Sequence, residues 1–227
     1  MIDIDDLEVE SVAFELRYNN VYRLWDTSGT IWAEMASKHP ELSVTNIQPN
    51  QQLFDTPKYQ ISLELGLFRV ISRGSEAIDQ VVTISSDIYA ALDHNIRLTS
   101  FSRSGLRIMQ SKTFESTSEA MTYCGSAQPV GNTSTKGLGT RVGFVSGNRY
   151  EGESSGLNAT LKVEERNINL NVQWDAIPYF KPLKEKKIVV VTDTDYYTIG
   201  TIDRETLDVS TWIYQASKAI KRFWGVL

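Results

Sequence analysis

The chain has 227 residues, of which 41% are hydrophobic and 22% are charged, a composition typical of a globular protein and not of a disordered chain. Its single cysteine, Cys124, excludes an intrachain disulfide, and one cysteine with two histidines, His39 and His94, cannot supply a Cys/His zinc site. The formal net charge of −5 argues against the broad basic footprint of a protein that binds duplex nucleic acid.

The N-terminal part of the chain predicts a strand followed by a helix. Apolar residues alternate over 9–18, the period of a strand with one buried face. Over 21–38 they recur at helical spacing, which predicts an amphipathic helix with Asn20 as its N-cap. We expect its aromatic side chains, Trp25 and Trp32, to pack on a sheet.

The next segment favours strands and contains one short helix. Residues 41–57 predict a strand fragment followed by an irregular loop, and 59–73 predict one long strand whose apolar phase changes near Gly66, as at a β-bulge. Residues 81–86 predict another strand. Asp87 is then expected to cap a short helix that ends at Leu92.

The middle of the chain predicts two strands, a helix and a loop. The strands cover 96–101 and 105–110, and the helix covers 113–123. Residues 126–140 are rich in Gly, Ser and Thr, so we expect a loop there and take it as the boundary between two lobes of one domain spanning 1–227. Its stretch GNTSTKGLGT resembles a phosphate-binding loop in composition only, because its lysine precedes the second glycine.

The C-terminal part predicts a β-meander, one more strand and a closing helix. Alternating apolar residues cover 142–144, 157–163 and 168–174, with a tight connection at 164–167. A further strand covers 187–199. The helix covers 209–224, with Asp208 as its N-cap.

Strands that follow one another directly, with helices near the two ends, favour an antiparallel sheet. We therefore predict an α+β fold in a single domain, with helices packed mainly on one face of the sheet. A sheet divided into two lobes is the alternative arrangement. The acidic start MIDIDDLEVE lacks the features of a signal peptide, and no apolar run approaches the ~20 residues of a membrane span. We expect a cytoplasmic protein with no membrane contact.

Three groups of residues are candidates for a site. Asp193 and Asp195 alternate on one strand face, so their carboxylates can converge on a ligand or a metal; a plain surface role is the alternative. The basic candidates for nucleic acid or phosphate, whose alternative is a solvated surface, are Arg103, Arg107, Lys184, Lys186 and Lys187. The candidates for a protein interface are Trp212, Lys221 and Trp224, of which Trp224 lies off the main apolar seam of its helix. We interpret Cys124 as a buried free thiol and not as a nucleophile paired with histidine.

Three stretches of the sequence resemble a sporadically distributed prokaryotic protein family of unknown function. They are VESVAFELRYNN near the N-terminus, SGLRIM at 104–109, and VVVTDTDYY together with the closing helix TWIYQASKAIKRFW. The chain departs from the family in lacking a histidine that is often found early in that helix. The resemblance implies no activity; the family's patchy distribution implies a role in phage defence or in neutralising toxins.

These observations leave three hypotheses about function. The first is a non-enzymatic binding or scaffolding subunit of a bacterial assembly, with a protein partner or a second copy of the chain as its ligand. The second is a ligand-binding protein or metal-dependent enzyme that uses Asp193 and Asp195. The third is a nucleic-acid-binding protein. No cofactor is predicted, and the residues favour a protein that is not an enzyme.

Overall fold

The computed structural model describes residues 2–19, 21–48, 51–125, 143–170 and 183–226. The strands are β1 (Glu8–Tyr18), β2 (Ser43–Gln48), β3 (Gln51–Asp55), β4 (Tyr59–Glu64), β5 (Leu67–Arg73), β6 (Ser100–Phe114), β7 (Phe144–Glu151), β8 (Ser155–Leu170), β9 (Leu183–Thr198) and β10 (Ile202–Asp203). They form one antiparallel sheet in the order β2-β3-β4-β5-β1-β6-β9-β8-β7, and β10 pairs with β6. The predicted α+β fold with an antiparallel sheet is confirmed, and the sheet is continuous.

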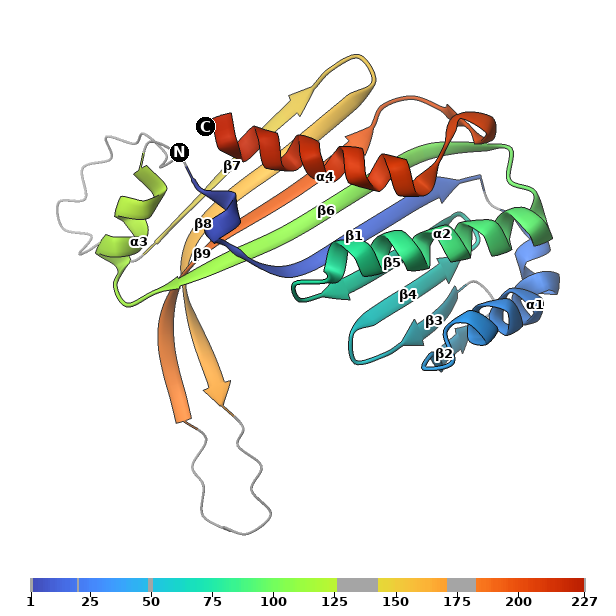
Figure 1. Ribbon diagram of the computed structural model, residues 1–227, viewed down its shortest axis with the longest axis horizontal. Helices are drawn as coiled ribbons and strands as arrows, with labels where there is room; N and C mark the ends of the chain where they lie inside the picture. Colours follow the sequence, from blue (N-terminus) through green and yellow to red (C-terminus); the bar gives the residue numbers. More distant parts are fainter. Residues whose placement is uncertain (1, 20, 49–50, 126–142, 171–182, 227) are drawn as a thin grey trace, which may run out of the picture.

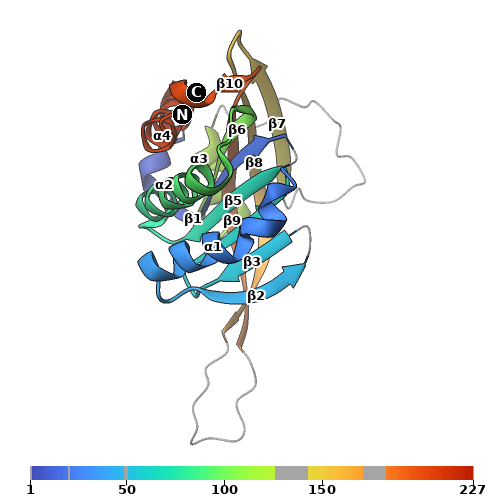
Figure 2. The same cartoon turned by 90° about the vertical axis from the view of Figure 1, so that its right-hand side faces the viewer.

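The helices lie together on one side of this sheet (Figures 1 and 2). They are α1 (Arg23–Lys38), α2 (Ala77–Ile96), α3 (Thr117–Cys124) and α4 (Val209–Val226), with the short 3₁₀ turns η1 (Ile4–Asp6) and η3 (Arg204–Thr206). Figure 2 shows that, within the described ranges, no helix covers the opposite side of the sheet. None of the described helices is long and apolar enough to cross a membrane.

Alternation along the central strands decides which side chains meet the helices. Phe14 and Leu16 of β1 are fully buried, and Phe68 and Val70 of the neighbouring β5 are buried on the same side. Successive side chains of a strand point to opposite faces, so the residues between them point away from the helices. In the sequence Glu15-Leu16-Arg17, Leu16 therefore lies in the core, and the charged side chains of Glu15 and Arg17 lie on the side that the helices do not cover.

The closing helix is fixed at its start and near its end. Asp208 Oδ1 accepts a hydrogen bond of 2.8 Å from the backbone N–H of Thr211, which confirms the predicted N-cap. Near the other end, Trp224 is 3% exposed and its indole Nε1 donates a hydrogen bond of 2.8 Å to Thr194 Oγ1 on β9. The helix is thereby attached to the central sheet through a buried polar contact.

Several predicted elements differ from the observed ones in the first half of the chain. The strand fragment predicted at the start of 41–57 corresponds to β2, and the irregular loop predicted after it contains β3, which pairs with β2. The single strand predicted over 59–73 is the hairpin of β4 and β5, and the change of phase near Gly66 marks its turn and not a bulge. The strand predicted over 81–86 and the short helix after it are both part of the 20-residue helix α2.

The strands of the second half are longer than predicted. The two strands predicted over 96–101 and 105–110 are parts of one strand, β6, which begins at Ser100, and Ile96 is the last residue of α2. The connection predicted at 164–167 lies inside β8. The helix predicted over 113–123 begins later, at Thr117, because the side chain of Ser116 caps it. The predicted lobe boundary at 126–140, the N-cap Asn20 and the end of the strand predicted to Trp174 lie outside the described residues.

Candidate anion-binding site on the open sheet face

The side of the sheet away from the helices has a hollow of about 300 Å³ over its central strands. We call this side the open face, and the residues that line the hollow are Ala13, Glu15, Arg17, Arg69, Ile71, Arg103, Gly105, Arg107 and Asp195. Two of the lining residues, Ala13 on β1 and Gly105 on β6, are small. In the register of the two strands, Ala13 lies opposite Arg107, and Gly105 lies opposite Glu15. Small residues at these positions leave room between the longer arginine side chains.

Four arginines from three adjacent strands surround this hollow. Arg69 is on β5, Arg17 on β1, and Arg103 and Arg107 on β6. Arg17 and Arg103 are directly opposite each other in the register of β1 and β6. Like charges directly opposite on paired strands are destabilising, so this arrangement costs stability unless anions lie between the guanidinium groups.

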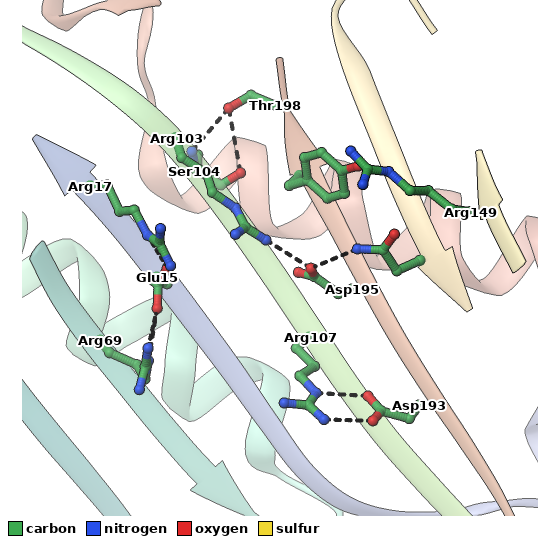
Figure 3. A network of polar contacts seen from close by, with 12 residues as sticks. Glu15, Arg17, Arg69, Arg103, Ser104, Arg107, Arg149, Asp193, Asp195 and Thr198 are labelled. Carbon is green, nitrogen blue, oxygen red and sulfur yellow. Dashed lines mark hydrogen bonds and ion pairs between the residues drawn. The ribbon is translucent and has the colours of Figure 1, made fainter. Parts of the chain in front are cut away.

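Glu15 is the anion that lies between Arg17 and Arg69 (Figure 3). Its Oε1 accepts a hydrogen bond from Arg17 Nε, and its Oε2 accepts bonds from Arg69, one of them 2.9 Å from Nε. Burial raises the pKa of the Glu15 carboxyl, but the hydrogen bonds and charges of Arg69 and Arg17 outweigh this effect and leave the pKa below its usual value. Glu15 therefore stays ionised and holds two arginines.

Arg103 is positioned by Asp195 and by an aromatic ring. Its Nη2 donates a hydrogen bond of 2.7 Å to Asp195 Oδ2, which also accepts a bond of 3.4 Å from Asn158 Nδ2 (Figure 3). The guanidinium lies 4.8 Å from the centre of the Tyr197 ring, a cation–π distance. The Nε atom of Arg103 is buried and has no hydrogen-bond partner among the described residues.

The Tyr197 ring occupies space that a glycine on the neighbouring strand leaves open. Gly156 lies opposite Tyr197, and a Cβ atom at Gly156 would come within 2.4 Å of the ring. The glycine therefore lets the ring lie flat on the sheet, where it is only 9% exposed. This ring forms a support for Arg103 and offers little surface to a ligand.

Arg107 and Asp193 form a paired fork at the edge of the site. Arg107 Nε and Nη2 donate hydrogen bonds of 2.7 and 2.6 Å to the two carboxylate oxygens of Asp193. These bonds, together with the charge of Asp193, raise the pKa of Arg107 despite its partial burial. Bidentate pairs of this kind fix the direction of both side chains.

The structure brings together the two aspartates and the two arginines that the sequence singled out. Asp193 and Asp195 share a face, as the strand period predicts, but each carboxylate is hydrogen-bonded to an arginine. Among the described residues there is no group of three or more His, Cys, Asp or Glu side chains that could hold a metal ion. The pair is thus placed to position arginines.

The predicted lysines lie elsewhere, near the start of β9. Lys186 forms an ion pair of 2.7 Å with Glu165, and Lys187 Nζ lies 3.3 Å from Glu115. Lys184 is in β9 opposite Asn169, and its side chain is outside the described residues. Lys187 and Asp195 are eight positions apart along β9, about 27 Å at the usual rise per residue, so these lysines do not belong to the hollow.

The predicted protein-interface residues differ in how far they are exposed to solvent. Trp224, predicted to meet a partner, is 3% exposed and its indole lies inside the core. Trp25, predicted to pack on the sheet, is instead 52% exposed beside Tyr22. Trp212 is half-buried against the rings of Phe14 and Tyr196. Lys221 is exposed and forms an ion pair of 2.7 Å with Asp5.

Cys124 is buried, and burial raises the pKa of its thiol to about 11. The thiol is therefore protonated at neutral pH, which is unfavourable for a nucleophile. His39 Nε2 lies 3.0 Å from Asp87 Oδ2 and His94 Nδ1 lies 3.6 Å from Glu34 Oε1. Each histidine thus has a carboxylate as its neighbour.

Sequence reasoning missed three residues of the site: Glu15, Arg17 and Arg69. The available signal was the position of each charge on the polar side of an alternating strand. What the sequence did not show is that β1 lies between β5 and β6, which brings these charges beside Arg103.

The chain matches no known family model and no curated protein. The resemblance seen in its sequence therefore remains a prediction.

Proposed function

We propose that this protein is a non-enzymatic binding protein that holds an acidic ligand on the open face of its sheet. The observation that carries this proposal is the convergence of four arginines on one hollow. The chain as a whole has a net charge of −5, so this local excess of positive charge runs against its average. A basic site on an acidic protein concentrates anionic ligands where the arginines are.

The geometry gives less support to a catalytic use of Asp193 and Asp195. Each carboxylate is hydrogen-bonded to a guanidinium at 2.7 Å or less, so neither is a free base. A general base must reach the proton that it abstracts, and a metal ligand must offer its lone pairs to the ion. Membership of a bacterial assembly in phage defence or toxin neutralisation rests on the sequence resemblance alone and remains a prediction.

The binding proposal is tested with acidic probes at low ionic strength. A fluorescent single-stranded oligonucleotide, an oligoglutamate peptide and a small phosphomonoester are titrated with the full chain, and binding is followed by anisotropy or calorimetry. The double variant R17Q/R103Q removes two charges from the hollow. R204Q/R222Q removes two charges from the helical side and is the matched control.

We expect at least one probe to bind in a salt-sensitive way, because electrostatic affinity falls as ionic strength rises. R17Q/R103Q should weaken this binding about tenfold or more, whereas R204Q/R222Q should leave it nearly unchanged. If no acidic probe binds at low salt, or if the two double variants lose binding equally, the open face is not the binding site.

A further inference from the structure

The arginines around the hollow are already partnered, which limits the ligands that can bind them. Glu15 holds Arg17 and Arg69, Asp195 holds Arg103, and Asp193 holds Arg107. A ligand must therefore bind the guanidinium groups more strongly than these resident carboxylates do, because both compete for the same N–H donors. A second simple carboxylate offers the same charge and the same two oxygens, so it has no advantage over the resident groups.

Many arginine donors remain for a ligand with more acceptors. Each guanidinium has five N–H donors, so four have about 20. Only six nitrogen atoms of these arginines donate the hydrogen bonds to Glu15, Asp193 and Asp195 described above. A phosphomonoester carries about −1.5 to −2 charges at neutral pH and three strong acceptor oxygens, more than any of the three resident carboxylates.

The charges around the hollow are positive on balance and therefore attract anions. Four arginines face three carboxylates, Glu15, Asp193 and Asp195, which leaves one positive charge. One positive charge matches a monoanion as well as a phosphomonoester, so the preference for the phosphomonoester rests on its three acceptor oxygens and on the charge-assisted hydrogen bonds that they accept. The volume of about 300 Å³ lies at the lower end of the range for ligand pockets, which suits a compact group.

Among the residues that the structure describes, the open face lacks the aromatic surface that a single nucleic-acid strand needs. Proteins that bind such strands stack bases on aromatic side chains beside a basic groove. Tyr197, the ring beside Arg103, is almost fully buried. The exposed aromatic side chains of the described chain lie elsewhere: Tyr22 and Trp25 at the start of α1, Tyr150 against Phe223 of α4, and Tyr214 on α4.

We propose that the hollow binds the phosphate group of a small phosphomonoester, with Arg17, Arg69 and Arg103 as the groups that contact its oxygens. This inference rests on the proposed function and specifies its ligand. The phosphate displaces Glu15 from at least one of its two arginines. Asp193 keeps Arg107 in a fixed orientation, and Asp195 with Tyr197 does the same for Arg103.

The competition with Glu15 allows a test in which two variants act in opposite directions. The full chain is titrated with phenyl phosphate, inorganic phosphate, diphenyl phosphate and benzoate at constant ionic strength, and affinities are measured by calorimetry. R103Q should weaken phenyl phosphate binding about tenfold, because it removes a charged fork. E15Q should strengthen it severalfold, because it removes the competing carboxylate. R204Q is the control and should change nothing.

Binding of phenyl phosphate and inorganic phosphate, with weaker binding of the diester and of benzoate, supports the inference. Binding of inorganic phosphate alone points to a free oxyanion as the ligand and overturns the assignment to a phosphomonoester. If phosphates fail while an oligonucleotide or acidic peptide still binds through Arg17 and Arg103, the phosphomonoester inference is wrong and the proposed function stands. If R103Q does not fold, R17Q at the more exposed rim is measured in its place, with the same expected direction.

Discussion

At the scale of single residues, Glu15 determines how the positive charges of the open face are tolerated. It lies between Arg17 and Arg69 and directly opposite Gly105. Without this carboxylate, Arg17 and Arg103 remain opposite each other across the strand pair with less compensation. The same residue therefore stabilises the free protein and competes with the ligand that we propose.

Replacing Glu15 by glutamine should lower the free energy of unfolding by about 1 kcal/mol at neutral pH, because partly exposed arginines lose charge-assisted hydrogen bonds. The folded-state pKa of Glu15 is lowered, so its contribution is present above the ordinary pKa of 4.5 and is lost as the pH falls through the lowered value. Urea unfolding at pH 7 and at pH 3 measures this. A difference between the two proteins that grows on acidification contradicts the account.

Trp224 is the second residue with a specific role, since it joins α4 to β9 inside the core. Replacing it by phenylalanine leaves the hydroxyl of Thr194 without its indole donor and should cost about 1–2 kcal/mol of stability. Trp25→Phe, at an exposed position, is the control and should change stability by less than about 0.5 kcal/mol. Equal effects of the two substitutions, measured by chemical denaturation, would show that Trp224 does not anchor the helix.

At the scale of elements, the start of α4 depends on one side chain. Asp208→Ala should destabilise the protein by about 1 kcal/mol, because the backbone N–H of Thr211 loses its capping acceptor. Asp203 precedes η3 and makes no capping hydrogen bond through its side chain, so Asp203→Ala is a matched control with a smaller expected effect. Thermal unfolding of both variants checks the prediction; an equal loss of stability in both contradicts it.

The elements also show which parts of the fold the sequence predicts. Strands with one buried face, such as β1, are evident because their alternation continues without interruption. Helix α2 was misread because its run of β-branched residues, Val81-Val82-Thr83-Ile84, is typical of a strand. The helix packs against the sheet, α1 and α4, and this tertiary burial outweighs the local preference.

The candidate site was predicted in part for a related reason. Asp193 and Asp195 were identified from their alternation on one strand, and Arg103 and Arg107 from their positive charge; the structure places the four together. The pairing of each aspartate with an arginine depends on β6 lying beside β9, which no local pattern determines. The lysines near 184–187 have a similar charge but lie far along the strand. Local charge therefore indicated candidates, and the order of the strands selected among them.

At the scale of the whole molecule, the two sides of the sheet differ: one is covered by helices, and the other carries the arginine-lined hollow. The helices α1, α2, α3 and α4 gather on one side and complete the core (Figure 2). The other side carries the hollow and its arginines at the centre of the sheet, where β5, β1 and β6 lie side by side. A central position on a continuous sheet gives these side chains a rigid base, which favours precise contacts with a small anion.

The most direct test of this account is a crystal structure of the full chain grown with tungstate, a heavy tetrahedral dianion that substitutes for phosphate. We predict an anomalous peak within hydrogen-bonding distance of at least two of Arg17, Arg69 and Arg103, with Glu15 withdrawn from one of its arginines. Tungstate bound at other basic groups of the protein, with no peak in the hollow, would contradict the account.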